Sequence, residues 1–330
     1  MHFLLRAASV LACFASLAVA QEGDAQPPQE KPPAKPAPLV VSFVAASGVV
    51  KLGQPLVLEL AIDANEPASL PASVLGGMEI ESAIDGAKST TLREPVSGKI
   101  QVAAGASIRR TITIDTAKYW PEASLRDKRQ IALKWVGLAG AEATVRIVPD
   151  QHEIDLAKLD YQKTKVRLIT SKGELVIGFL PEVAPRHVEN FVKLSKDGFY
   201  DGTRFHRVIK GFMIQGGCPN TKRGATGAPG TGSPGWTVRA EFNETKHMKG
   251  VVSMARAQGE DTAGSQFFLM HGEAPHLNGK YSAFAMIEQG IDVLDLIADT
   301  PVVPSRMGET SVPVEDLWLW AAVVEPSFKE

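Results

Sequence analysis

Cysteine is almost absent from the 330 residues, which contain only Cys13 and Cys218. If the N-terminal segment that contains Cys13 is removed, Cys218 is the only thiol left, which excludes an intramolecular disulfide. Long apolar runs are also missing, since nothing after the first segment approaches the roughly 20 apolar residues of a transmembrane helix. Excess positive charge is absent as well, with 35 basic against 37 acidic residues. This balance gives no electrostatic footprint for a nucleic-acid partner.

The first twenty residues have the pattern of a secretory signal peptide. Arg6 gives a positive start, residues 7–19 are mostly apolar, and Ala18-Val19-Ala20 is an A-x-A cleavage site. We therefore expect an exported protein, periplasmic or secreted after cleavage near Ala20. A lipoprotein lipidated at Cys13 is the alternative, but the apolar segment before that cysteine would be very short.

Two further segments precede the second half of the chain. Residues 21–38 are polar and proline-rich, which predicts an extended linker. Residues 39–150 contain short alternating segments separated by turn residues, and this pattern favours a small immunoglobulin-like β-sandwich. Residues 39–150 show no metal-ligand cluster and no nucleophile–base pair, so we expect a spacer or docking domain. An envelope protein is one candidate partner for it.

Residues 151–162 are expected to join the halves, and residues 163–326 to form a second β-rich domain. A hairpin is predicted for residues 166–179, around the turn Ser171-Lys172-Gly173. Helices are predicted after Pro185, where an apolar stripe runs to Leu194, and again around residues 291–298.

The run FHRVIKGFMIQGG, residues 205–217, sets one arginine among apolar residues at strand-like spacing. Read with a period of two, Phe205, Arg207 and Ile209 share one face. A bend at Lys210-Gly211 would bring Arg207 near Phe212, Met213 and Gln215. Such a patch suits a small apolar ring bearing a carbonyl. The alternative is a surface arginine whose stem lies on barrel core residues.

Three later motifs extend this pattern: SMARA at residues 253–257, AGSQFF at 263–268 and HLNGKY at 276–281. With FHRVI-x-GFMIQGG, they occur in the order and approximate spacing of the cyclophilins, the peptidyl-prolyl cis-trans isomerases. Residues 163–326 therefore resemble that family. The resemblance implies an eight-stranded antiparallel β-barrel with two helices and a substrate groove on its outer face.

The same resemblance assigns roles to individual residues. Arg207 corresponds to the catalytic arginine and Gln215 to its partner amide. The residues that it implies for substrate binding are Phe212, Met213, Ala255, Arg256, Gln266, Phe268, His276, Leu277 and Tyr281. The expected substrates are proline-containing polypeptides, and neither a cofactor nor a metal is expected.

The implied chemistry explains the residue types. Rotation about a peptide bond is opposed by about 18–20 kcal/mol because nitrogen shares its lone pair with the carbonyl. In the twisted state the proline nitrogen recovers that lone pair, which a guanidinium can stabilise. Arg207 would supply this charge while apolar residues hold the ring.

Two positions depart from the best-known eukaryotic members: His276 stands where they carry tryptophan, and Tyr281 where they carry histidine. The first departure makes cyclosporin binding doubtful, because the indole donates a hydrogen bond to the drug. Two alternative functions remain. One is a proline-peptide binding or chaperone module with little turnover, and in the other the N-terminal domain carries the biological task.

Overall fold

The computed structural model describes residues 37–51, 54–87, 90–94, 96–120, 129–149 and 151–329. The predicted signal peptide and nearly all of the predicted linker lie outside these ranges, as does Cys13. Among the described residues, no helix has the length and apolar character needed to cross a membrane.

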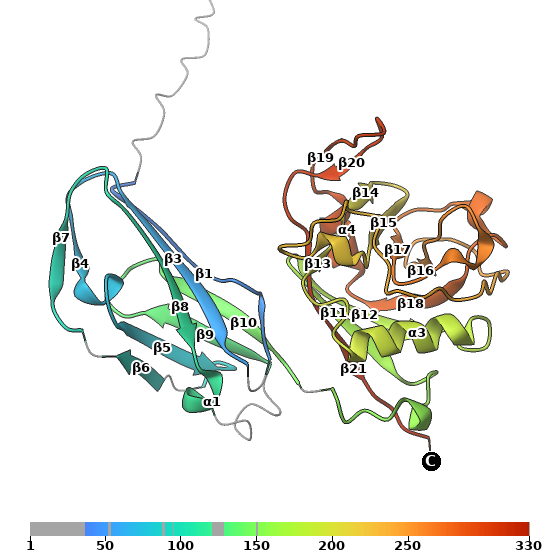
Figure 1. The fold of residues 1–330 in the computed structure, drawn as a ribbon, viewed down its shortest axis with the longest axis horizontal. Helices are drawn as coiled ribbons and strands as arrows, with labels where there is room; N and C mark the ends of the chain where they lie inside the picture. The colour runs from blue at the N-terminus through green and yellow to red at the C-terminus, as the bar shows by residue number, and fades with distance from the viewer. Residues whose placement is uncertain are drawn as a thin grey trace, which may run out of the picture. The chain divides into compact units, whose positions relative to one another are not determined.

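The N-terminal strands form two main sheets (Figure 1). The first has the order β1-β3-β8, the second has the order β2-β10-β9-β5-β6, and β4 pairs with β7 separately. The strands are β1 Leu39–Ala45, β2 Val49–Lys51, β3 Leu56–Ala64, β4 Ala68–Pro71, β5 Met78–Ile84, β6 Thr90–Glu94, β7 Lys99–Val102, β8 Ser107–Ile114, β9 Gln130–Trp135 and β10 Glu142–Val148. The helices among the described residues of this half are η1 Ala72–Val74 and α1 Thr116–Tyr119.

One core lies between these two sheets. Leu58 and Leu60 on β3 are at most 1% exposed, and Ile131 and Trp135 on β9 belong to the same buried cluster. The alternation of buried and exposed residues along each strand places these side chains on the inner faces. The predicted β-sandwich is therefore confirmed, and its buried Trp135 donates from Nε1 to Ser73 Oγ at 3.1 Å.

The second half of the chain is a barrel with two longer helices (Figure 1). Its strands are β11 Lys165–Thr170, β12 Gly173–Phe179, β13 Thr203–Arg204, β14 Arg207–Ile209, β15 Met213–Gly216, β16 Val251–Met254, β17 Phe267–Met270, β18 Ala283–Gln289, β19 Val302–Pro304, β20 Thr310–Pro313 and β21 Trp318–Glu325. Its helices are η2 Leu156–Lys158, α3 Pro185–Lys196, η3 Pro219–Thr221, η4 Glu260–Thr262, η5 Pro275–Leu277 and α4 Ile291–Ala298. The predicted hairpin and both predicted helices are confirmed.

The barrel closes where the chain passes from β13 to β14. The sheet order is β13-β21-β11-β12-β18-β16-β17-β15-β14, so its two end strands are consecutive in sequence. Phe205 N donates to Leu317 O before β21 at 2.9 Å, and His206 N donates to Gln215 O on β15 at 3.0 Å. Phe205 and His206, which are adjacent in sequence, thus bond to opposite sides of the seam at which the barrel closes. Counted as one crossing strand, β13 and β14 complete the predicted eight-stranded antiparallel barrel.

This crossing also corrects one prediction about side-chain faces. The period of two predicts that Phe205 shares a face with Arg207, but Phe205 is 2% exposed and packs in the barrel interior. Val208 is buried there too, while Arg207 lies on the outer face. The period of two holds within β14 and fails at the crossing, because the backbone leaves one strand pairing for another.

The barrel interior is built around Phe191 of α3. Its ring lies 4.9 Å from that of Tyr200 and 5.2 Å from those of Phe267 and Phe284. Part of the segment expected to join the halves also belongs to this domain. Leu159 is fully buried in the same core.

Gly217, next to the site strand β15, gives a stability prediction. Its φ is +79°, and a Cβ there would lie 2.5 Å from Ser265 O. Gly217→Ala should therefore cost about 1–2 kcal/mol for the left-handed backbone and about 1–3 kcal/mol more for overpacking. The exposed Gly224 has a φ of +77° with nothing within 4 Å of a Cβ, so Gly224→Ala should cost only the backbone part. Urea unfolding of both variants checks this, and equal midpoints would contradict it.

Candidate active site

The hairpin β14–β15 holds the first site residues. Its antiparallel register pairs Arg207 with Gln215 and Ile209 with Met213. Because alternate residues of a strand share a face, Met213 and Gln215 project from β15 on the same side as Arg207. Gly211, with a φ of +81°, allows the three-residue turn that follows β14. The sequence motif thus becomes one continuous patch on the outer face.

His271 connects the turn of this hairpin to neighbouring segments of the same chain. Its Nδ1 accepts a hydrogen bond from Gly211 N at 2.8 Å, so its Nε2 carries the proton that faces Asp295 Oδ1 at 3.0 Å. Phe212 O accepts from His271 N at 2.9 Å and from Gly272 N at 3.1 Å. These bonds fix the position of Phe212 at the edge of the patch.

An apolar floor lies beside the hairpin. On β17, Phe268 and Met270 belong to a buried outer cluster, whereas Phe267 and Leu269 face the barrel interior. Met213 and Leu277 join the outer cluster at 2% and 7% exposure. The strand period of two therefore gives the barrel a second small core, separate from its interior.

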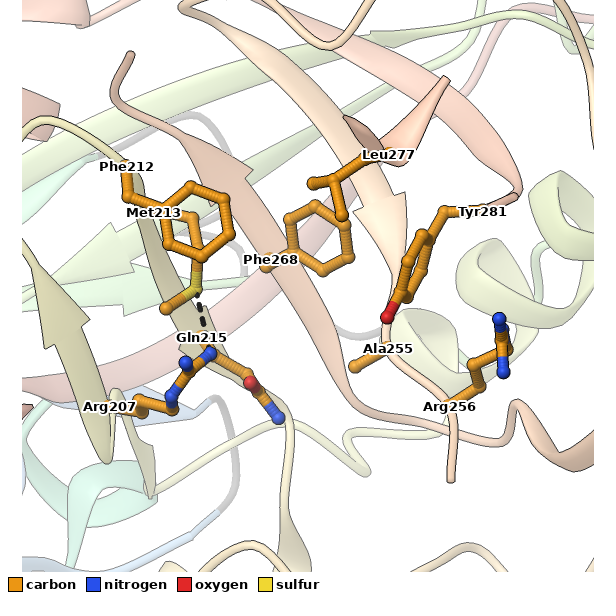
Figure 2. A pocket seen from close by; sticks show the side chains of 9 residues that line it. All are labelled: Arg207, Phe212, Met213, Gln215, Ala255, Arg256, Phe268, Leu277 and Tyr281. Carbon is orange, nitrogen blue, oxygen red and sulfur yellow. Dashed lines mark hydrogen bonds between the residues drawn. The ribbon is translucent and has the colours of Figure 1, made fainter. Parts of the chain in front are cut away.

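This floor is the base of a hollow of about 490 Å³, open mouth included (Figure 2). The residues that line it are Arg207, Phe212, Met213, Gln215, Ala255, Arg256, Phe268, Leu277 and Tyr281. Nine of the eleven residues assigned from the sequence are thus brought together.

The other two assigned residues lie just outside this lining. Gln266 Oε1 accepts from Gln215 Nε2 at 3.1 Å, and Gln266 Nε2 donates to Gly230 O and Gly232 O at 2.8 and 2.9 Å. Gln266 therefore orients Gln215. His276 is exposed, and its ring centroid lies 5.9 Å from that of Phe212.

Arg256 and Tyr281 form the opposite side of the pocket. The Arg256 guanidinium lies 4.9 Å from the Tyr281 ring centroid, and its Nη1 donates to Ala257 O and Gln258 O at 3.1 and 3.2 Å. Tyr281 in turn makes an edge contact with Phe268 at 5.6 Å. Arg256 is thus occupied with backbone and ring partners.

The guanidinium of Arg207 has a carboxylate partner that the sequence motifs did not indicate. Arg207 Nε donates to Glu309 Oε2 and Arg207 Nη2 to Glu309 Oε1, both at 2.7 Å. Arg207 Nη1 points to Met213 Sδ at 3.6 Å, within the pocket (Figure 2). The hydrogen bond from Arg207 lowers the pKa of Glu309. Glu309 lies 102 positions after Arg207 in the sequence, so no local pattern could have found it.

A second residue without a sequence signal is His247, behind the pocket floor. It is 1% exposed, and its ring stacks on that of Phe268 at 6.0 Å. Its Nδ1 faces Asn278 Oδ1 at 3.2 Å and its Nε2 faces Ser253 Oγ at 3.0 Å. Burial lowers the pKa of His247. A neutral ring with the proton on Nδ1 satisfies both partners.

The assembled site offers three things to a ligand: a fixed cation, an oriented amide and an apolar pocket. The nine lining residues include no cysteine, serine or carboxylate. Among the described residues, no group of three or more metal-ligating side chains is close enough together to hold an ion. The geometry suits recognition of an apolar ring and electrostatic stabilisation at its polar atoms.

Comparisons with known proteins identify relatives of this domain. The family model described as cyclophilin type peptidyl-prolyl cis-trans isomerase/CLD matches residues 165–317. A peptidyl-prolyl cis-trans isomerase of Synechococcus elongatus is 49% identical over 125 residues, 38% of this chain and 81% of that protein. One of Helicobacter pylori is 42% identical over 164 residues, 48% of this chain and 93% of that protein. A solved structure of a Cryptosporidium parvum cyclophilin is 31% identical and covers 49% of this chain and 99% of its own, with a TM-score of 0.44.

His206, beside Arg207, gives a pH prediction. Burial is the main cause that lowers the pKa of His206 from 6.5 to about 4; a backbone hydrogen bond to Arg204 opposes this shift, and the charges of Arg207 and Arg204 add to it. The unfolded chain then binds this proton more readily than the folded chain between those values. The stabilisation is complete above pH 6.5 and is lost as the pH falls towards 4. His206→Gln should therefore reduce the pH dependence of the urea midpoint between pH 7 and pH 4. An NMR titration that gave His206 an ordinary pKa would refute this.

Proposed function

Since the chain belongs to the cyclophilin-type peptidyl-prolyl cis-trans isomerases, we propose that Arg207 is the group that accelerates rotation about X-Pro bonds. The isomerase acts on proline-containing polypeptides. One observation carries the assignment of the mechanism. The guanidinium of Arg207 lies at the edge of the apolar pocket, opposite Gln215 in the strand register.

The proposed catalysis is electrostatic. In the planar ground states the proline nitrogen shares its lone pair with the carbonyl, so the nitrogen offers little to a cation. In the twisted transition state the nitrogen becomes pyramidal and accepts a hydrogen bond. A guanidinium fixed before the reaction then stabilises the transition state more than either ground state.

The remaining pocket residues hold the substrate while the bond turns. Phe212, Met213 and Phe268 would hold the proline ring, and Leu277 closes the floor. Gln215, oriented by Gln266, would bond to a backbone group of the substrate. With the ring held, the carbonyl that precedes proline is the part free to rotate. This division of tasks needs neither a nucleophile nor a proton transfer.

The second candidate is a proline-peptide binding or chaperone module with little turnover. The same pocket would serve it, so contacts with the ring cannot separate the two functions. The oriented guanidinium favours catalysis, because binding of an apolar ring gains little from a cation held beside it. A binding module would bind peptide without accelerating exchange.

We also propose that the protein acts on exported polypeptides, with residues 39–150 as a docking or spacer domain near an envelope partner. The support is the signal-peptide pattern of residues 1–20. Mass spectrometry of the protein from the native host should find a mature chain that begins at Gln21. A mature protein that retained residues 1–20, or one lipidated at Cys13, would contradict cleavage at Ala20.

The central prediction concerns Arg207→Ala. Loss of the cation should reduce kcat/KM for a short proline peptide by about a hundred-fold, the size of effect seen when one transition-state donor is removed. The thermal midpoint should change little, because the Arg207 and Glu309 side chains are 34% and 42% exposed and such pairs add at most about 1 kcal/mol. Exchange between cis and trans peptide, followed by NMR, measures the rate.

Two variants accompany this measurement. Arg207→Lys keeps the charge but loses the planar fork, so it should fall between Arg207→Ala and wild type. Arg186→Ala removes an exposed arginine of α3 outside the pocket and should leave the rate unchanged. A full rate for Arg207→Ala would reject the mechanism. Peptide binding without acceleration by wild type would favour the binding module.

A further inference from the structure

The hairpin β19–β20, a two-stranded sheet separate from the barrel sheet, brings Glu309 to the site. Its turn is closed by Gly308 N donating to Ser305 O at 2.9 Å and Ser305 N donating to Glu309 O at 2.7 Å. Gly308 adopts a φ of +85°, which suits such a turn. The strand β20 that follows packs alongside β14 (Figure 1). Glu309 is therefore held at the end of a strand next to Arg207.

The neighbours of Glu309 fix the direction of its side chain. Ser311, two residues further, shares its face and is 2% exposed. Hydrogen bonds from Arg207 and from Ser311 both favour the charged carboxylate and lower its pKa. The carboxylate thus has partners on its own strand and on β14.

The two bonds between Glu309 and Arg207 define the orientation of the guanidinium. Each joins a different carboxylate oxygen to a different nitrogen, Nε and Nη2, and both are 2.7 Å long. Two parallel bonds of this kind fix the plane of the fork as well as its position. The third nitrogen, Nη1, is directed at Met213 Sδ on the pocket side.

We propose that Glu309 is a positioning residue, which holds the guanidinium of Arg207 with its Nη1 edge towards the substrate. The inference rests on the proposed catalytic role of Arg207. An arginine side chain has several rotatable bonds and loses rotamer entropy when it is fixed. Fixing it before the substrate arrives removes that cost from the transition state.

A carboxylate has a second effect of opposite sign. Its negative charge partly offsets the field of Arg207 at the substrate nitrogen. If this offset dominated, removal of Glu309 would accelerate the reaction. The effect on orientation should dominate, because the carboxylate binds the edge of the guanidinium that faces away from the pocket. Solvent weakens the effect of its negative charge at the more distant substrate nitrogen.

The test replaces Glu309 by Ala and by Gln in the full chain and measures kcat and KM separately. Loss of an interaction that acts only in the transition state lowers kcat and kcat/KM together. We expect about a ten-fold fall in both for Glu309→Ala, with KM nearly unchanged. Glu309→Gln keeps one acceptor oxygen, so its loss should be smaller.

Two further arms separate positioning from a structural role. In the Arg207→Lys background no bidentate fork can form, so Glu309→Ala should have almost no additional effect. The control Glu315→Ala breaks the exposed 2.7 Å ion pair with Lys172 outside the pocket and should leave the rate at the wild-type value.

Each result decides between the proposals. An unchanged or raised rate for Glu309→Ala, with the rate of Arg207→Ala still strongly reduced, would overturn the positioning role and leave the proposed function standing. An equal fall in the Arg207→Lys background would also overturn it, because the effect would then not pass through Arg207. A full rate for Arg207→Ala would instead reject the proposed catalytic role of Arg207, on which the positioning role rests.

Discussion

Arg207 and Gln215 face each other across β14 and β15, and the arrangement of the pocket follows from that pairing. The register places Met213 opposite Ile209, which brings the apolar floor next to the guanidinium. The same pairing requires the chain to leave β13, cross the barrel seam at Phe205 and His206, and join β15. The strand that closes the barrel therefore also carries the arginine of the site.

The barrel keeps stability and recognition on opposite faces of the same strands. On β17, Phe267 packs in the interior while Phe268 forms the floor of the pocket. A substitution on the outer face can therefore change the site and leave the larger interior core intact. His247 contributes to both the stability of the domain and the shape of the pocket, because its buried neutral ring stacks on Phe268 behind the pocket floor.

Rotation about an X-Pro bond requires little from the protein other than a well-placed charge and a pocket. In the mechanism proposed above, the position of the charge therefore matters more than any reactive group, so the residues that hold Arg207 belong to that proposal. Gln215 is oriented by Gln266, and the guanidinium is gripped by Glu309. An arginine on a short strand, with its side chain 34% exposed, would otherwise sample several rotamers.

The sequence alone determined the strand alternation, both helices, the hairpin at residues 166–179 and the site residues that belong to contiguous motifs. Arg207 and Gln215 could be grouped because the period-two pattern and the bend between them are local properties of the chain, and Phe268 because its motif resembles that of the cyclophilins. The sequence could not place Phe205 in the barrel interior, because the alternation of faces is interrupted at the seam of the closed barrel. Nor could it find Glu309, which reaches Arg207 only because β20 packs beside β14. Contacts between residues a hundred positions apart depend on how the strands assemble, and only the tertiary structure decides them.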